Sequence, residues 1–313
     1  MKVQAAIGEK RAGSLLGPDF FIVGAPKCGT TAMAAYLGQH PEIGMCPRKE
    51  SHVFAADLKQ RMTVKRNDGP MSKERFLDLF ADLQEEPIRG EASVWHLYSE
   101  AAPAEIMAFQ PEARIIVMLR NPIEMLPSLH SQFVFVGIEP VEDFGTALAL
   151  DEERERSGVP RGFPPRSYRS AVRYAEQVKR YLDVFGRERV HVILYDDFRD
   201  DTLEAYRGAC EFLGVDPEFE PQVEIVNPNK EVRSRILQTF VKTPPEWARP
   251  LLHRLTTENQ RRRTGDALTR VNTRFRRRDP ISDPLRTSLV PEAERQVREL
   301  DELLGLDVSR WVD

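Results

Sequence analysis

The chain has 313 residues and a formal net charge of −4, with 41% hydrophobic and 30% charged residues. These fractions are ordinary for a soluble globular protein, and the length suffices for one large α/β domain or two small ones. The three cysteines, Cys28, Cys46 and Cys210, show no C-x-x-C spacing, which argues against a disulfide framework or a zinc site and favours a reducing compartment. Residues 1–19 lack the apolar core of a signal peptide, and no apolar run reaches the roughly 20 residues that cross a bilayer. We therefore expect a cytoplasmic protein without a membrane segment.

The charge is unevenly distributed along the chain. Residues 230–280 hold 14 Lys/Arg and 5 Asp/Glu, a net +9 that leaves −13 for the remainder. A basic segment can serve an anionic ligand or a nucleic acid. This one is interrupted by Pro and Thr and contains no nucleic-acid motif, so a solvated basic face is the commoner explanation. We expect no nucleic-acid partner.

The first predicted unit is a strand, a glycine loop and a helix between residues 20 and 38. Residues 20–23 form a continuous apolar run, which suits a strand buried on both faces. Gly24 and Gly29 punctuate the loop, and good helix formers run from Thr30 to Gly38. This order points backbone N–H groups and the positive end of a helix dipole at a phosphate.

The loop departs from the nucleotide P-loop G-x-x-x-x-G-K-S/T in the position of its cation. Gly24, Gly29 and Thr31 fit that motif, but Thr30 stands in the lysine slot and Lys27 lies inside the loop. In the standard motif the lysine reaches the β/γ-phosphates and the hydroxyl residue holds Mg²⁺. The displaced lysine has a shorter reach, which favours a ligand that ends one group beyond a single 5′-phosphate. A tight turn with an incidental lysine is the simpler alternative.

Residues 26–31, Pro-Lys-Cys-Gly-Thr-Thr, resemble the P-K-x-G-S/T-S/T loop of sulfotransferases that use 3′-phosphoadenosine 5′-phosphosulfate (PAPS). The resemblance implies that this loop holds the 5′-phosphosulfate. The donor-binding residues that it implies here are Lys27, Cys28, Gly29, Thr30 and Thr31.

The segment that follows the first helix resembles the K-E-x-H-F-F stretch of the heparan-sulfate-type sulfotransferases, through Lys49, Glu50, His52 and Phe54. In that group the glutamate removes the proton of the acceptor, and a hydroxyl or amine must lose a proton as it attacks sulfur. The resemblance therefore implies Glu50 as the general base, with Lys27 and His52 as the other catalytic candidates. A surface ion pair between Lys49 and Glu50 is the plainer interpretation.

A second carboxylate comes from residues 88–93, which resemble the family's G-E-x-S/T segment near the acceptor. They follow a helix predicted over residues 72–83. Glu91 and His96 are candidate acceptor-binding residues and alternative bases. A lone histidine such as His96 is more often a satisfied structural residue than a catalyst.

Residues 114–119 predict a central parallel strand that ends at Arg120, and Pro122 begins a helix that contains Ser128. Ligands of open α/β sheets bind at the carboxyl ends of the strands. The pattern L-R-D/N-P with a serine downstream resembles the family's 3′-phosphate motif, which implies Arg120 and Ser128 as its ligands. Arginine gives bidentate charge-assisted bonds to a phosphate. ATP lacks the 3′ group that this second site would bind.

The following segments are predicted as a long loop around a short helix over 137–167, a helix over 168–185, a strand over 190–198 and a helix over 202–213. The loop is either an acceptor-binding lid or a surface excursion. The strand ends in Tyr-Asp-Asp-Phe, which resembles the family's Y-E-D-L segment but is also where a kinase would place its Mg²⁺-binding aspartate.

The C-terminal third offers fewer signals. The resemblance makes Arg233 and Arg235 candidates for a basic loop over the 3′-phosphate and adenine. Residues 291–311 predict an amphipathic helix and a tail that ends in Trp311.

We expect one P-loop NTPase-like three-layer α/β domain over residues 1–313, with a mainly parallel sheet flanked by helices. Its core would span 19–311, with variable acceptor-side segments at 137–167 and 240–288. The resemblance implies in-line transfer of a sulfuryl group from PAPS to a hydroxyl or amine of a small-molecule or glycan acceptor. The scheme requires no metal, because Lys27 supplies the charge. The alternatives are a Mg²⁺-dependent P-loop kinase and a non-catalytic nucleotide-binding module, and the sequence leaves the oligomeric state open.

Overall fold

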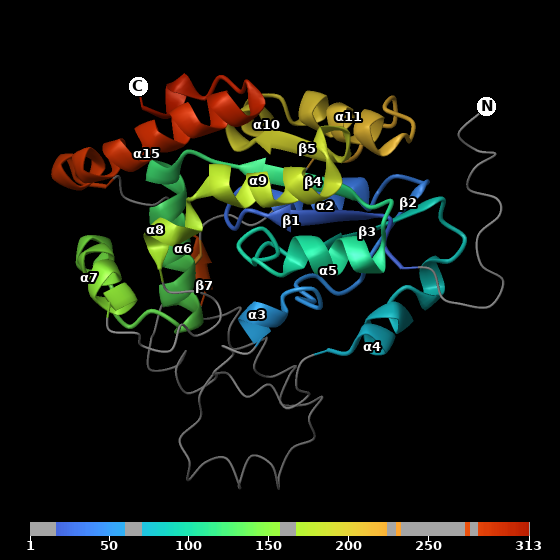
Figure 1. The fold of residues 1–313 in the computed structure, drawn as a ribbon, viewed down its shortest axis with the longest axis horizontal. Helices are drawn as coiled ribbons and strands as arrows, with labels where there is room; N and C mark the ends of the chain where they lie inside the picture. The colour runs from blue at the N-terminus through green and yellow to red at the C-terminus, as the bar shows by residue number, and fades with distance from the viewer. Residues whose placement is uncertain are drawn as a thin grey trace, which may run out of the picture.

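The structure is a computed structural model that describes residues 17–59, 71–156, 167–223, 230–232, 273–275 and 281–312. A central sheet lies between two layers of helices (Figure 1). The predictions for Arg233 and Arg235 fall outside the described residues.

The sheet has five strands in the order β2-β3-β1-β4-β5, and every neighbouring pair is parallel. This confirms the predicted P-loop-type sheet, and the continuous apolar runs are explained by its burial on both faces. The strands are β1 (Phe20–Gly24), β2 (Ile43–Met45), β3 (Ile88–Ala92), β4 (Arg114–Leu119) and β5 (Val190–Leu194).

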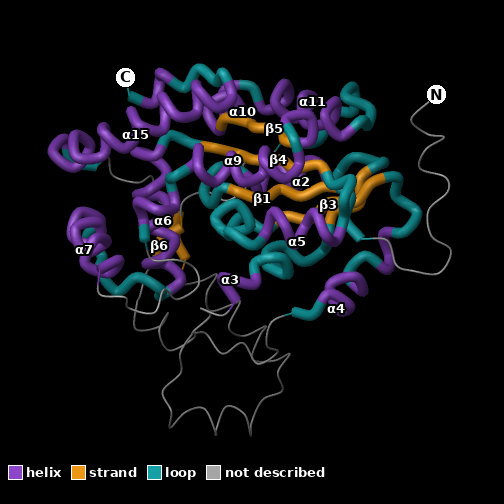
Figure 2. The backbone as a smooth tube through the Cα atoms, viewed as in Figure 1, coloured by secondary structure: helices purple, strands orange, loops and turns teal. Residues whose placement is uncertain are grey.

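Helices cover both faces of the sheet, as the tube in Figure 2 shows. Helix α2 (Thr30–Leu37) packs with α11 (Thr202–Leu213) on one side, and α5 (Ala102–Phe109) packs with α9 (Tyr174–Phe185) on the other. This division follows from right-handed crossovers, since β1 connects toward one edge of the sheet and β3 toward the other. Helix α15 (Asp283–Leu304) lies across α6 (Pro122–Val136) and α9.

Further elements complete the described structure. They are α3 (Ala56–Lys59), α4 (Lys73–Asp78), η1 (Ala81–Leu83), α7 (Phe144–Arg156), α8 (Tyr168–Ala171), η2 (Arg187–Arg189), α10 (Tyr195–Asp200), η3 (Ser309–Trp311) and the antiparallel pair β6 (Lys230–Val232) and β7 (Thr273–Phe275). Among the described residues, none of the helices is both long and apolar enough to span a bilayer.

Several predicted boundaries are wrong. The strand predicted over 190–198 ends at Leu194, and α10 follows it at once. The helix predicted over 168–185 is two helices, α8 and α9, separated by two residues. The C-terminal helix begins at Asp283 rather than Pro291, which lies inside it; Pro284 occupies the first turn, where a proline is well tolerated. The helix within 137–167 has 13 residues, longer than expected.

Candidate functional site

The site is built at the carboxyl ends of β1 and β4, which are neighbours in the sheet. The chain leaves β1 into the glycine loop and leaves β4 at Arg120. The Arg120 guanidinium donates from Nη1 to the carbonyl oxygen of Lys27 at 3.4 Å. The two segments predicted to bind anions therefore meet in the fold, 93 residues apart in sequence.

The conformation of the glycine loop requires its glycines. Gly29 has φ 86°, and a Cβ there would lie 3.0 Å from the ring of Phe198. A Cβ on Gly24 would lie 2.6 Å from the Cβ of Leu97. Gly29 is the N-cap of α2 and offers no side-chain acceptor to the first N–H groups of the helix. These N–H groups and the helix dipole make the loop a suitable place for an anion.

Arg120 is held in place at the end of β4. Its Nη2 lies 2.7 Å from Oε2 of Glu124, and its guanidinium lies 4.4 Å from the ring centroid of Tyr195. Only 17% of the side chain is exposed. Ser128 is 5% exposed in the body of α6. An anion at Arg120 would compete with Glu124 for a guanidinium whose plane is already oriented by the tyrosine ring.

The C-terminal tail supports this edge of the site. Trp311 is fully buried, its indole donates to Oδ2 of Asp196 at 3.1 Å, and its carbonyl oxygen accepts from Nδ2 of Asn121 at 2.9 Å. Asn121 follows Arg120 and caps α6 by accepting from the N–H of Ile123. The tail thus fixes the turn that carries Arg120.

Asp196 and Asp197, the two aspartates of the segment where a kinase would place its Mg²⁺ ligand, are both engaged by other groups, Asp197 by Arg310. Asp196 contacts the Trp311 indole, and its Oδ1 lies 3.1 Å from Nη1 of Arg199. In the described parts of the chain, groups of three or more His, Cys, Asp or Glu that could hold a metal do not occur. The Asp196 carboxylate therefore serves the tail, and the geometry does not favour the kinase alternative.

Cys28 contributes backbone rather than thiol chemistry to the loop. Its side chain is fully buried, and its Sγ donates to the carbonyl oxygen of Pro26 at 3.4 Å. Burial raises the pKa of the Cys28 thiol to about 12, against the smaller opposing effect of Arg120. All three cysteines are free.

Glu50 lies in the loop between β2 and α3 and is fixed through both its backbone and its carboxylate. Its N–H donates to the carbonyl oxygen of Ala92 at 2.9 Å, and its Oε2 accepts from the N–H of Val94 at 3.1 Å. His52 Nε2 lies 3.6 Å from the same oxygen. Burial raises the pKa of Glu50, while Lys49 and the Val94 N–H counter that rise. One third of the side chain remains exposed, which leaves the carboxylate accessible.

Lys49 connects this loop to the glycine loop. Its ammonium lies 3.7 Å from Oε1 of Glu50 and also donates to the hydroxyls of Thr30 and Thr31. Lys49 and Glu50 do form the ion pair of the plainer interpretation, but both side chains are only partly exposed, and the pair also bridges to the start of α2. This contact brings the predicted base to the predicted phosphosulfate loop.

Strained backbone coincides with the predicted catalytic residues. Among the described residues other than glycine, positive φ angles occur at Lys27 (65°), Glu50 (60°) and His52 (50°). Such conformations are uncommon for residues with a Cβ and persist where the surrounding structure enforces them, often at functional sites. This strain could not be predicted from residue type, since none of the three is a glycine or an asparagine.

Glu91 and His96 lie beneath Glu50 rather than on the open surface. Both side chains are fully buried. Glu91 Oε1 accepts from Ser51 Oγ at 2.8 Å and from Ser93 Oγ at 2.5 Å, and Oε2 lies 3.6 Å from Nδ1 of His96. Neither meets solvent, so their binding of an acceptor stays a prediction. In the described structure Glu91 joins the Glu50 loop to the turn after β3.

Glu91→Gln is expected to change how stability depends on pH. Burial raises the pKa of Glu91 from 4.5 to about 7, against the hydrogen bonds from Ser93 and Ser51. The pKa of Glu91 is higher in the folded than in the unfolded protein. The protonated carboxyl of Glu91 therefore contributes its full stabilisation of the fold below pH 4.5, and this contribution is lost as pH rises through 7. The loss is on the order of 3 kcal/mol.

Urea unfolding of both proteins at pH 5 and pH 8 measures this difference. Between pH 5 and pH 8 the free energy of unfolding should fall more for the wild type than for the glutamine variant. The two proteins share all other titrating groups, so the difference between them reports on Glu91. An identical pH dependence in the two proteins would show that Glu91 does not carry the proton.

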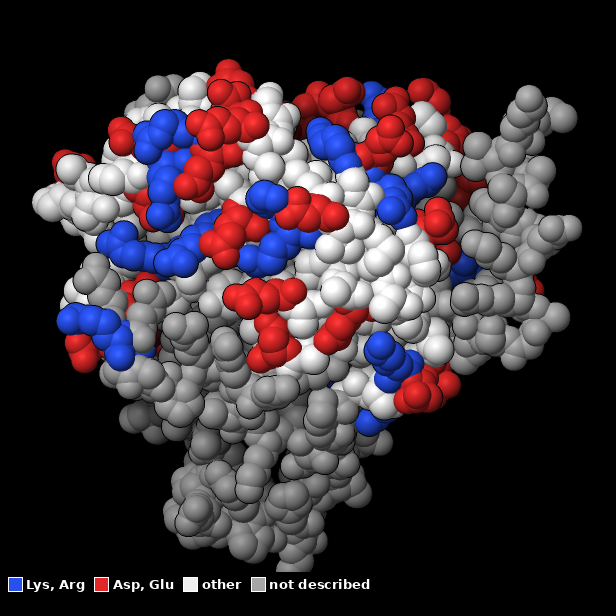
Figure 3. Space-filling view, in the orientation of Figure 1, with Lys and Arg blue, Asp and Glu red and all other residues white. Residues whose placement is uncertain are grey.

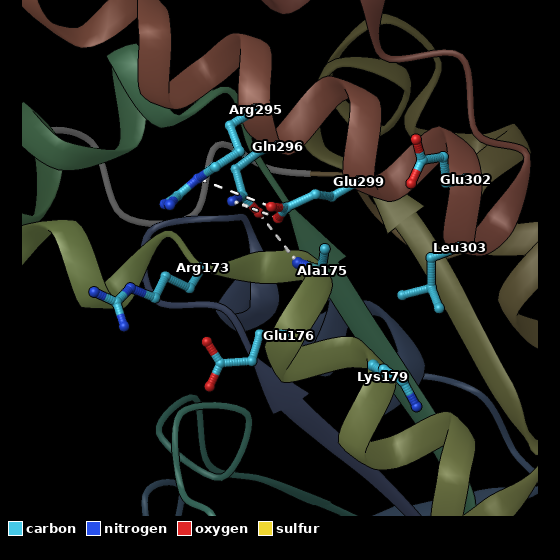
Figure 4. Close-up of a pocket in the computed structure, with 9 residues that line it drawn as sticks. All are labelled: Arg173, Ala175, Glu176, Lys179, Arg295, Gln296, Glu299, Glu302 and Leu303. Atoms are coloured by element: carbon cyan, nitrogen blue, oxygen red, sulfur yellow. Dashed lines mark hydrogen bonds and ion pairs between the residues drawn. The ribbon is translucent and has the colours of Figure 1, made fainter.

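A hollow elsewhere on the molecule does not coincide with this site. It lies between α9 and α15 (Figure 4), and its lining is largely charged. Arg295 within it is paired with Glu299 and Glu292. The lining residues are Arg173, Ala175, Glu176, Lys179, Arg295, Gln296, Glu299, Glu302 and Leu303. On the face seen in Figure 3, acidic and basic side chains are intermingled, which offers no single-sign surface there.

The sequence missed the groups that hold the site together. Tyr195 under Arg120, Trp311 on Asn121 and Lys49 on the threonine hydroxyls are all contacts between segments distant in sequence. The sequence patterns included all three residues (Lys49 in K-E-x-H-x-F, Tyr195 in Tyr-Asp-Asp-Phe, and Trp311 at the end of the predicted tail), but none of the patterns indicated these contacts.

Comparison with known proteins finds sulfotransferases in each case. The family model described as "Sulfotransferase domain" matches residues 17–240. A solved sulfotransferase from Alicyclobacillus acidocaldarius is 31% identical, with a TM-score of 0.71, over 95% of this chain and 100% of that one. Carbohydrate sulfotransferase 15 of Mus musculus is 28% identical over 270 residues, which are 70% of this chain and 47% of that protein. The N-deacetylase/N-sulfotransferase 1 for heparan sulfate of Caenorhabditis briggsae is 20% identical over 224 residues, 70% of this chain and 25% of that protein. The chain spans about half the length of the mouse protein and about a quarter of the length of the Caenorhabditis protein.

Proposed function

The chain belongs to the sulfotransferase domain family, and from this premise we propose that it transfers a sulfuryl group from PAPS to a hydroxyl or amine of an acceptor. The observation that carries the proposal is the meeting of three segments at one edge of the sheet. Arg120 contacts the backbone of Lys27, and Lys49 contacts both Glu50 and Thr31.

The residues present fit both ends of the donor. Lys27 and the N–H groups at the start of α2 would hold the 5′-phosphosulfate, whose charge needs donors and a cation. Arg120, with Ser128 in helix α6 just downstream, would hold the 3′-phosphate. The guanidinium suits a phosphate because it gives two parallel charge-assisted bonds.

Glu50 would act on the acceptor. In the proposed step the acceptor oxygen or nitrogen forms a bond to sulfur while the bond from sulfur to the 5′-phosphate oxygen breaks. The acceptor proton passes to Glu50, and the negative charge left on the phosphate is met by Lys27. A partly exposed carboxylate 3.7 Å from the Lys49 ammonium, with a pKa that burial raises, suits the role of proton acceptor. The proposed step is an in-line group transfer.

We propose a carbohydrate or a small hydroxylated or aminated metabolite as the acceptor. The printed names of the similar curated proteins refer to carbohydrate and to heparan sulfate. Those proteins are longer than this chain, so we extend to it only the chemical class of the acceptor.

Incubation with PAPS and a panel of glycans and metabolites, followed by mass spectrometry, tests the function. We expect at least one acceptor to gain the mass of one SO₃ group, with adenosine 3′,5′-bisphosphate formed in equal amount. A matched incubation with ATP and Mg²⁺ should give no phosphorylated product. Phosphoryl transfer from ATP in that control, together with no sulfuryl transfer from PAPS, would contradict the proposal.

A further inference from the structure

Lys49 occupies a position that the donor scheme above leaves without a role. Its Nζ donates to Thr31 Oγ1 and lies 3.4 Å from Thr30 Oγ1, across 18 and 19 residues of sequence. The same ammonium lies 3.7 Å from Oε1 of Glu50. A single cation thus touches the first turn of α2 and the proposed base.

The hydroxyl of Thr31 is the group that would bind Mg²⁺ in a nucleotide P-loop. Here its neighbour is an ammonium, which brings one positive charge to the same hydroxyl. In this chain Thr30 also replaces the lysine that normally follows the second glycine of the motif. The loop therefore draws its charge from Lys27 within it and from Lys49 beside it.

The surroundings of Lys49 favour an additional anion. The ammonium has three donors, and Thr30, Thr31 and Glu50 supply only one formal negative charge among them. The side chain is 28% exposed. Burial lowers the pKa of Lys49, while Glu50 opposes that shift. A partly desolvated ammonium is stabilised by each further anionic oxygen that reaches it.

We propose that Lys49 is a second donor-binding cation, which meets the 5′-phosphosulfate end of PAPS at the hydroxyls of Thr30 and Thr31. This inference rests on the proposed function. Lys49 stays protonated through the transfer. The bond from sulfur to the 5′-phosphate oxygen breaks, the acceptor proton goes to Glu50, and Lys49 shares with Lys27 the negative charge that remains on the phosphate. Because it contacts Glu50 as well, Lys49 links donor binding to the position of the base.

Two ligands distinguish donor binding by Lys49 from a purely structural role in which Lys49 only holds two loops together. Adenosine 3′,5′-bisphosphate carries the 5′-phosphate, whereas adenosine 3′-phosphate lacks it and engages only the Arg120 side. Calorimetric titration of wild-type protein and Lys49→Met should show about a tenfold to hundredfold loss of affinity for the bisphosphate, as for a lost charge-assisted bond. Affinity for adenosine 3′-phosphate should stay unchanged.

Two further variants complete the experiment. Lys49→Arg keeps the charge and should recover part of the bisphosphate affinity. Lys179→Met makes the same substitution in an exposed pair with Asp183, 2.7 Å apart and 59% exposed, and should bind both ligands like the wild type. If Lys49→Met does not fold, Lys49→Gln removes the charge while it keeps a hydrogen bond to a threonine hydroxyl.

The outcomes are distinct. Wild-type affinity for the bisphosphate in Lys49→Met, or an equal loss for both ligands, would overturn the role of Lys49 and leave the proposed function standing. A wild-type protein that binds neither ligand would overturn the proposed function itself, and this inference with it.

Discussion

Glu50→Gln is expected to lower turnover by about 10²- to 10⁴-fold, the usual cost of losing a general base. Glutamine keeps the shape of the side chain and can still accept from the N–H of Val94, which now lies 3.1 Å from Oε2. It cannot take up a proton from the acceptor. Donor affinity should change little, because Glu50 is placed on the acceptor side of the scheme. Turnover with the acceptor from the PAPS incubation, and titration with the bisphosphate, measure the two quantities.

His96→Asn serves as the control for this assignment. His96 is fully buried next to Glu91, so its replacement should leave turnover nearly intact once folding has been checked by thermal unfolding. If His96→Asn abolished turnover while Glu50→Gln stayed active, the base would be the histidine and the assignment of Glu50 would be wrong.

Local sequence was sufficient to predict the scaffold of the site. The apolar run at 20–23, two glycines and a run of helix formers specify β1, the loop and α2 with little help from the rest of the chain. The run at 114–119 predicts β4 in the same way, since a strand buried on both faces has no polar alternation. Because parallel strands end at one edge, the proximity of the two loops follows from the fold class.

Contacts between segments distant in sequence could not be predicted from local sequence patterns. A surface pair remained a possible interpretation of Lys49 and Glu50 because nothing in their neighbours indicates the hydroxyls of α2, which are 18 or more residues away. Tyr195 begins a helix although its apolar context predicts a longer strand, and its ring then lies against Arg120. Burial of His96 and Glu91 depends on packing between segments, which no spacing rule gives.

Arg120→Ala is expected to weaken binding of adenosine 3′,5′-bisphosphate by about 2 to 3 kcal/mol, roughly a hundredfold. The variant removes the guanidinium proposed for the 3′-phosphate and leaves Glu124, whose charge would repel that phosphate. The fold should survive, because Arg120 follows β4 and its side chain lies outside the apolar body of the strand. Affinity for 5′-AMP, which has no 3′-phosphate, should be nearly unchanged.

Arg207→Ala is the matched control. It removes a guanidinium that is 2.9 Å from Glu220 and 37% exposed, so it should bind the bisphosphate like the wild type. Unchanged affinity in a folded Arg120→Ala protein would remove Arg120 from the site.

A calorimetric titration of the wild-type protein and Arg120→Ala with three ligands tests the use of PAPS most directly. The ligands are adenosine 3′,5′-bisphosphate, 5′-AMP, and ATP with Mg²⁺. We expect the wild type to bind the bisphosphate more tightly than either other ligand, and Arg120→Ala to bind the bisphosphate no more tightly than 5′-AMP. Tighter binding of ATP with Mg²⁺ than of the bisphosphate would rule out PAPS as the donor and favour a kinase.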